Sequence, residues 1–449
     1  MRVRYFVLLL ALAIACLPRP AAADLPDVVK RYVDDMTLIV GRIDVTELST
    51  DAIVAFMEEL LREAPERERN EILNNMRQGL SGLDETLAPF REQELNTAYF
   101  IAGADTFVQD EQPLMVVPVA DAEKARVLGT LLAARGQQYR HVEGAVLVGT
   151  PGAMNVAQGV QPVDRPRLSA GISNARNAPA FQLSFEPTPF VRFAAEMGAQ
   201  ELLNQTNRIP AGVVDFVADF EAVSFKLSLP PRPEMNVRVD FPTEESAESG
   251  REFIAEMVGM MQENFRRRLE PAMADQLLAA LLPEAQGKRM VLELTPQEMR
   301  ETIGPVMVLS MIRNHEAANR IRAGRNLRKL AQGVLLWSYE HGDGRLPEEL
   351  ALVEQVFTNP EADGTTWEDV RRNPRFGAED AFAYVRPAER LDQIREPDIT
   401  VIAYEKPPAS GIREGVNVAF ADGRVEWMSA KDFEELASLQ KFEIEHLPR

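Results

Sequence analysis

The stretch GVNVAFADGRVEW, residues 415–427, contains two short runs of alternating apolar residues joined by a turn. Apolar side chains occupy every second position from Val416 to Phe420, which is the period of a β-strand. Asp422 and Gly423 are residue types that tolerate the positive φ angles of a two-residue hairpin loop. The stretch therefore predicts a β-hairpin whose turn is formed by Asp422 and Gly423.

A long helix is predicted upstream of this hairpin. Thr295 is a suitable N-cap, Pro296 suits the first helical position, and Glu298 completes a capping box. Apolar residues then recur at helical spacing until a turn that is rich in glycine. We therefore expect a helix over residues 295–341, followed by a C-terminal domain over residues 342–449.

Two segments ahead of this helix share one predicted order of elements. In residues 24–160 the predicted strands are Thr37–Asp44, Thr97–Ala102, Leu114–Ala120 and Ala145–Gly149, with one helix from about Thr50 and another capped by Asp121. In residues 161–294 the predicted strands are Phe181–Phe185, Ala222–Leu229, Met235–Phe241 and Met290–Leu294, with helices at corresponding positions. Both segments thus have the order β-α-β-β-α-β, which is that of a split, ferredoxin-like module.

The predicted fold class is therefore α+β. It consists of two tandem ferredoxin-like modules over 24–160 and 161–294, the long helix, and a small antiparallel sheet at the C-terminus. The alternative is a single larger α+β domain without internal symmetry.

Three stretches in the C-terminal third match a known family in order. NLRKLAQGVLLWSYEHGDGRLP at 326–347 is followed by AYEKP at 403–407 and by the hairpin stretch at 415–427. Together they resemble the pseudopilin-like secreted proteins abundant in planctomycetes, whose signature is NVxFADGxVEW with a histidine separated from the Asp-Gly by nine intervening residues. Ile412 occupies the position of that histidine, so this chain departs from the family there.

The resemblance covers roughly residues 326–427 and implies a pilin-like plan, a long helix followed by a small antiparallel sheet. It does not imply pilus assembly, because a prepilin has its hydrophobic helix at the N-terminus. The residues that match the family motif are Tyr404, Lys406, Pro407, Asn417, Asp422 and Gly423.

The first 23 residues have the features of a secretory signal peptide. Two arginines precede an apolar run, Phe6–Leu17, and three small residues end at Ala23. The run is too short for a permanent transmembrane span, which needs about 20 residues. We expect an exported protein, periplasmic or extracellular; lipid attachment at Cys16 is the alternative, which Pro18 disfavours.

Charge and composition limit the possible functions. The chain has 449 residues, a net charge of −20 and one cysteine. Loss of three arginines with the signal would lower the charge to −23, and loss of Cys16 would leave no cysteine for a disulfide or a thiolate site. An acid excess of this size argues against a nucleic-acid partner, because phosphates would be repelled.

The sequence predicts no catalytic, cofactor-binding or metal-binding residues. Its four histidines are not paired at helical spacing, and it has no nucleophile elbow, glycine-rich phosphate loop or zinc-protease motif. We expect a non-enzymatic structural or interaction protein of the cell envelope. The alternative is an extracytoplasmic enzyme or small-ligand binder with a carboxylate-lined cleft between the two modules.

One basic segment interrupts the acidic sequence. Residues 313–329 contain six basic residues and a single acid, Glu316. Arg320, Arg322 and Arg325 form the predicted contact surface, for an envelope protein or a polyanion. The alternative is a solvated face that offsets neighbouring carboxylates.

Overall fold

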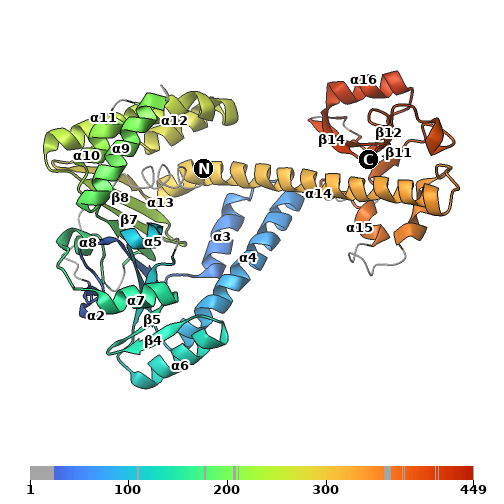
Figure 1. Ribbon diagram of the computed structural model, residues 1–449. Helices are drawn as coiled ribbons and strands as arrows, with labels where there is room; N and C mark the ends of the chain where they lie inside the picture. Colours follow the sequence, from blue (N-terminus) through green and yellow to red (C-terminus); the bar gives the residue numbers. More distant parts are fainter. Residues whose placement is uncertain are drawn as a thin grey trace. The chain divides into compact units, whose positions relative to one another are not determined.

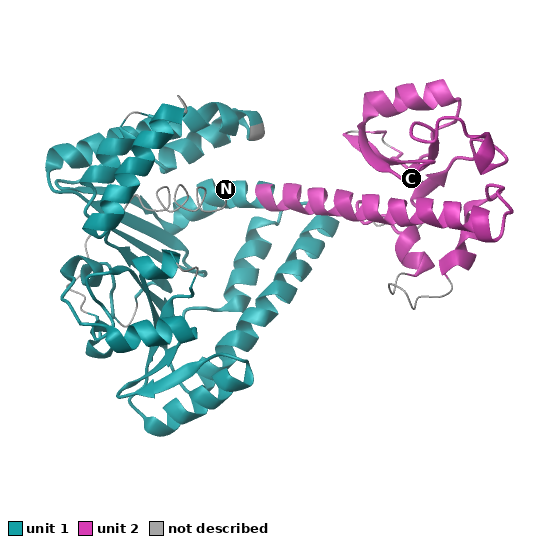
Figure 2. Cartoon of the chain, in the orientation of Figure 1, with its two compact units in different colours: residues 1–309 teal, residues 310–449 magenta. Residues whose placement is uncertain are grey.

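The computed structural model describes most of the chain and divides it into two compact units. The described residues are 25–108, 111–175, 178–205, 209–210, 212–357, 366–376, 378, 380–409, 411–412 and 414–447. Unit 1 comprises Met1–Leu309 and unit 2 comprises Ser310–Arg449 (Figure 2). The predicted export segment, with Cys16, lies outside the described residues.

Unit 1 is built on one ten-stranded sheet in which every pair of neighbouring strands is antiparallel (Figure 1). Its strands, in the order of the sheet, are β4 (Tyr139–Val142), β5 (Ala145–Val148), β3 (Leu114–Pro118), β2 (Thr97–Gly103), β1 (Thr37–Asp44), β6 (Phe181–Phe185), β7 (Ala222–Ser228), β8 (Glu234–Asp240), β10 (Arg289–Leu294) and β9 (Glu284–Ala285). The two predicted modules share this sheet, because β1 pairs directly with β6.

Twelve helices of unit 1 are described. They are α2 (Asp27–Lys30), α3 (Thr50–Leu60), α4 (Glu66–Glu92), α5 (Ala104–Val108), α6 (Ala122–Ala134), α7 (Pro151–Gly159), α8 (Pro166–Ala170), α9 (Pro189–Gln205), α10 (Val213–Asp219), α11 (Glu244–Arg268), α12 (Pro271–Ala280) and α13 (Pro296–Glu298).

The ferredoxin-like modules are not confirmed. That topology places the first strand of a module beside the third, whereas β1 lies beside β2, and β6 beside β7. The reason is the number of helices between those strands. A single crossover helix returns the chain parallel to the first strand, with space for another strand between. Here two helices intervene, α3 and α4 or α9 and α10, and the chain returns antiparallel to its neighbour.

Helices cover both faces of the first half of the sheet. Leu87 of α4 and Leu128 of α6 pack with Val117 on one face. Met154 of α7 and Leu168 of α8 pack on the opposite face. In the second half, the described core lies beneath α10, α11 and α12, whose apolar side chains cover β7, β8 and β10. Burial of these faces supplies the main driving force for folding.

The predicted helix over 295–341 is present. Thr295 and Glu298 form the expected capping box, and the helix continues through a π-helical turn, Met299–Ile303, into α14 (Gly304–Glu340). The boundary between the two units falls inside α14.

Unit 2 contains the predicted small antiparallel sheet, with a helix on each face. Its strands, in order, are β11 (Phe382–Tyr384), β12 (Val401–Glu405), β13 (Gly415–Phe420) and β14 (Val425–Ser429). Residues of α14 such as Leu327 pack on one face, while Phe433 of α16 (Ala430–Gln440) packs on the other (Figure 1). Shorter helical segments are Leu350–Phe357, α15 (Trp367–Arg371) and Leu391–Gln393.

Candidate functional site

The first group of residues in the predicted motif binds the C-terminal segment of the chain to β12. Tyr404 is almost fully buried, and its hydroxyl accepts a hydrogen bond from the backbone N–H of Glu445 at 2.7 Å. Burial raises the pKa of this phenol, and the bond from Glu445 opposes the rise. Lys406 Nζ lies 2.8 Å from the Glu445 carboxylate, and the Pro407 carbonyl accepts from Leu447 N–H. These motif residues therefore hold the fold together at its C-terminal end.

Glu405, between Tyr404 and Lys406, is the centre of a buried polar cluster that the sequence analysis missed. Its side chain is fully buried and accepts hydrogen bonds from Asn373 Nδ2 at 3.0 Å, Arg375 Nη1 at 3.0 Å and the backbone N–H of Asn417 at 2.7 Å. A buried carboxylate is tolerated only when it is paired and hydrogen-bonded in this way.

Asn417, the motif residue on β13, connects the sheet to α14. Its side chain is 6% exposed, and Nδ2 donates to the backbone carbonyl of Arg320 at 3.1 Å. On α14, Gly324 lies opposite: a Cβ there would stand 3.1 Å from Asn417 Oδ1. The absence of a side chain at Gly324 thus lets the backbone of α14 approach Asn417 closely.

Two guanidinium groups lie close to the ring of Trp427. The Cζ atoms of Arg320 and Arg375 are 4.8 Å and 4.6 Å from its ring centroid. Each contact has the geometry of a cation–π interaction. Arg320 therefore lies on the side of α14 that faces the sheet. The other two arginines of the predicted contact surface, Arg322 and Arg325, are exposed instead.

Asp422 and Gly423 form the predicted turn, but the loop has three residues instead of two. The Phe420 carbonyl accepts from Gly423 N–H at 2.9 Å, and Phe420 N–H donates to the Arg424 carbonyl at 2.9 Å. Gly423 has φ +85°, while Asp422 keeps a negative φ. This is a tight turn followed by a left-handed residue, which needs a positive φ only at the glycine. Asp422 Oδ1 accepts from Arg424 N–H at 2.9 Å and stabilises the loop.

Arg322 and Arg325 are exposed on α14, as the prediction of a contact surface requires. Arg322 Nη1 donates to Asn319 Oδ1 at 3.4 Å. Among the described residues, no carboxylate forms an ion pair with Arg325 or with Arg328, one turn farther along the helix. The exposed positive charge of α14 therefore comes from Arg322, Arg325 and Arg328, and not from Arg320.

In unit 1, a pocket of about 200 Å³ lies beside the start of β1. Its lining includes the carboxylates of Asp34, Asp105 and Glu111. All its lining residues lie between positions 32 and 160, within the first predicted module. The Glu111 carboxylate accepts a hydrogen bond from the Thr150 hydroxyl, and Asp34 Oδ1 accepts from Thr37. The pocket is smaller than the usual 300–1,000 Å³ of small-molecule sites.

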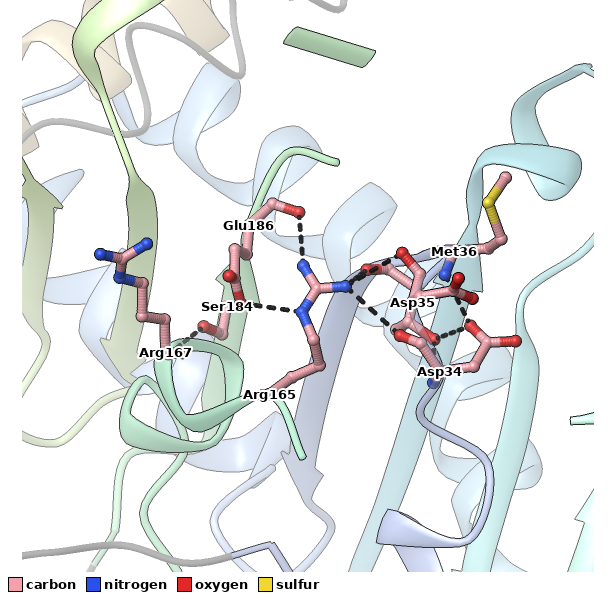
Figure 3. A network of polar contacts seen from close by, with 8 residues as sticks. Asp34, Asp35, Met36, Arg165, Arg167, Ser184 and Glu186 are labelled. Atoms are coloured by element: carbon pink, nitrogen blue, oxygen red, sulfur yellow. Dashed lines mark hydrogen bonds and ion pairs between the residues drawn. The ribbon is translucent and has the colours of Figure 1, made fainter. Parts of the chain in front are cut away.

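Arg165 connects the start of β1 in the first half of the sheet to Glu186, just after β6 in the second half (Figure 3). Its Nη1 donates to the backbone carbonyls of Asp34, Asp35 and Thr37 at 3.1–3.3 Å, and its Nε donates to Glu186 Oε2 at 3.2 Å. Because the arginine is 12% exposed and Glu186 16%, the pair is largely screened from water. These contacts assign Arg165 a structural role.

Neither a family model, nor a curated protein, nor a solved structure matches the chain. Over the described ranges, no three His, Cys, Asp or Glu side chains come together as a metal site. Among the described residues, no helix is both long enough and apolar enough to span a bilayer.

Proposed function

We propose that this chain is an exported, non-enzymatic structural or interaction protein of the cell envelope, with a pseudopilin-like C-terminal domain. One observation carries the proposal: the polar groups of the motif region are bonded to the chain itself. Glu405, Tyr404, Lys406 and Asn417 all have partners within unit 2. Polar side chains that are hydrogen-bonded within the chain stabilise a scaffold, whereas a catalytic site needs polar side chains directed at a substrate.

The exposed face of α14 is the proposed contact surface. Between Glu316 and Glu340 the helix has no acid, although the chain as a whole has a net charge of −20. Its core side is fully buried at Leu327 and Leu330, so Arg322 and Arg325 belong to its solvent side. A positive surface on a negative protein favours an acidic partner or another polyanion.

We further infer that the two halves of the large sheet are an internal repeat. Each half runs strand, two helices, two paired strands, one or two helices and a second pair of strands, and the halves meet at β1 and β6. This arrangement supports a protein built by duplication of one supersecondary unit.

A second candidate is an extracytoplasmic enzyme or small-ligand binder. The pocket beside β1 favours it, because Asp34, Asp105 and Glu111 would attract a small cation such as an alkyl amine. Thermal unfolding of the chain with 1,4-diaminobutane tests this candidate: a rise in midpoint that Glu111→Gln abolishes supports it, and no rise rejects it.

Recovery of envelope proteins on the immobilised chain tests the main proposal. Arg322→Glu with Arg325→Glu should remove proteins that the wild type retains from an envelope extract. Arg395→Glu is the matched control, because Arg395 is also an exposed arginine of unit 2. Recovery that is identical for wild type and the α14 variant would contradict the proposal.

A further inference from the structure

The solvent side of α14 carries one continuous stripe. Its members, spaced three or four residues apart and all exposed, are Ile321, Arg325, Arg328, Gln332, Leu336 and Tyr339. Residues at this spacing lie on one face of a helix. Ile321 is 56% exposed and Tyr339 75%, so two arginines lie between uncovered apolar side chains. Exposed apolar side chains interspersed with arginines are typical of a helix face that binds another molecule.

A stripe of opposite charge and equal length lies on α11 of unit 1. Its members, again three or four residues apart and all exposed, are Glu245, Glu248, Glu252, Glu256, Met260 and Glu263. The opposite side of α11 is buried in the core through Phe253, Ile254 and Val258. Within the described part of the chain, Glu252 and Glu256 have no ion pair.

We propose that the α14 stripe of one molecule binds the α11 stripe of a second copy of this chain. The proposal rests on the proposed use of α14 as a contact surface and names its partner. In an antiparallel alignment that sets Met260 beside Ile321, Glu256 falls beside Arg325 and Glu252 within one residue of Arg328, because the spacings are four and four residues on α11 and four and three on α14. Unpaired charges of opposite sign then meet, with one apolar pair, Met260 and Ile321, beside them.

The position of the arginines argues against a bilayer as the occupant. Interfacial helices keep their basic residues on the polar face, away from the apolar side that enters the membrane. Here Arg325 and Arg328 lie within the stripe, between Ile321 and Leu336, where a bilayer would have to accept them together with the apolar anchors. A row of carboxylates on a facing helix accommodates the same pattern.

Sedimentation velocity of the purified chain, over a wide concentration range at low and high salt, tests the proposal. We expect the wild type to associate reversibly and to dissociate as salt screens the charges. Arg325→Glu with Arg328→Glu, or Glu252→Arg with Glu256→Arg, should each weaken association at least tenfold, because each variant presents two stripes of the same charge. An equimolar mixture of the two variants should associate again, since each α14 then meets an α11 of opposite charge.

The mixture also serves as the folding control, because two misfolded variants would not restore association. A wild type that stays monomeric, or variants that associate as the wild type does, would overturn the inference, as would a mixture that stays monomeric. Anionic phosphatidylglycerol vesicles form a separate arm, and vesicle binding without self-association would replace the second copy with a membrane. If extract recovery still depends on the α14 charges while the chain is monomeric, only the self-contact is wrong. If extract recovery does not depend on them, the proposed function itself is wrong.

Discussion

Replacing Glu405 with alanine should destabilise unit 2 more than any surface substitution. The change removes a fully buried carboxylate, so Asn373 Nδ2 and the backbone N–H of Asn417 lose their acceptor and Arg375 loses its ion-pair partner. Breaking a buried ion pair from one side costs about 3–5 kcal/mol, because the largely buried guanidinium loses the carboxylate that offsets its desolvation. That is a large part of the roughly 5–15 kcal/mol by which a domain is stable.

Urea unfolding followed by tryptophan fluorescence measures this loss selectively. The three tryptophans, Trp337, Trp367 and Trp427, all belong to unit 2. With a urea dependence of about 2 kcal/mol per molar, the midpoint should fall by roughly 2 M. Glu435→Ala on the exposed side of α16 is the control and should change stability by no more than about 0.5 kcal/mol.

A second variant separates charge from volume. Glu405→Gln keeps the size of the side chain but turns an NH2 group towards a donor, so it should lose more than half of what alanine loses. A loss below about 1 kcal/mol for Glu405→Ala would refute the claim that this cluster holds unit 2 together.

Three substitutions test other parts of the account. Asn417→Ala removes the hydrogen bond to the Arg320 carbonyl and should cost about 1–2 kcal/mol in the same urea titration; no change would show that this bond does not hold the sheet to α14. Gly423→Ala forces a Cβ into φ +85° and should also cost about 1–2 kcal/mol, and an unchanged midpoint would contradict the turn geometry. Lys226→Met should raise the thermal midpoint of unit 1, measured by circular dichroism at pH 7. Burial, and secondarily Arg238, lowers the pKa of Lys226, so the unfolded chain binds the proton more tightly and the lysine destabilises the fold. The advantage of methionine should be complete below the lowered pKa and disappear above the unfolded pKa of 10.5; an equal advantage on both sides would contradict the assignment.

Local signals in the sequence were sufficient for individual elements. The capping box at Thr295 and Glu298 marks the start of the long helix correctly, because both partners lie within one turn. The strand Thr37–Asp44 is confirmed with the predicted bounds, since its β-branched residues are buried in a sheet.

Topology could not be predicted in the same way. The helix α4, Glu66–Glu92, has few buried apolar residues among many polar ones, and it was not predicted from the sequence. Its presence changes the direction in which the chain returns to the sheet, and the ferredoxin-like order fails for that reason. In the second half α10 was missed in the same way, so one missed helix in each half altered the arrangement of correctly predicted strands.

The buried polar cluster around Glu405 could not be predicted from the sequence either. Arg375 and Glu405 are 30 residues apart, and no helical or strand period relates them. The one available signal was a glutamate directly after the apolar run Val401–Tyr404, because a charge at the end of a buried strand requires a partner. The motif residues were identified, but their role as internal contacts depends on the folded neighbours.

Photo-cross-linking from Gln332, in the middle of the α14 stripe, tests the central claim most directly. A photoreactive residue at this exposed position, in cells that produce the protein, should give a cross-linked product, whereas the same residue at exposed Ser438 on α16 should not. A product of twice the chain mass, in which the peptide of position 332 is cross-linked to a peptide of Glu244–Arg268, would identify a second copy of the chain as the partner. No product from Gln332, or equal products from both positions, would contradict the assignment of this helix face as a contact surface.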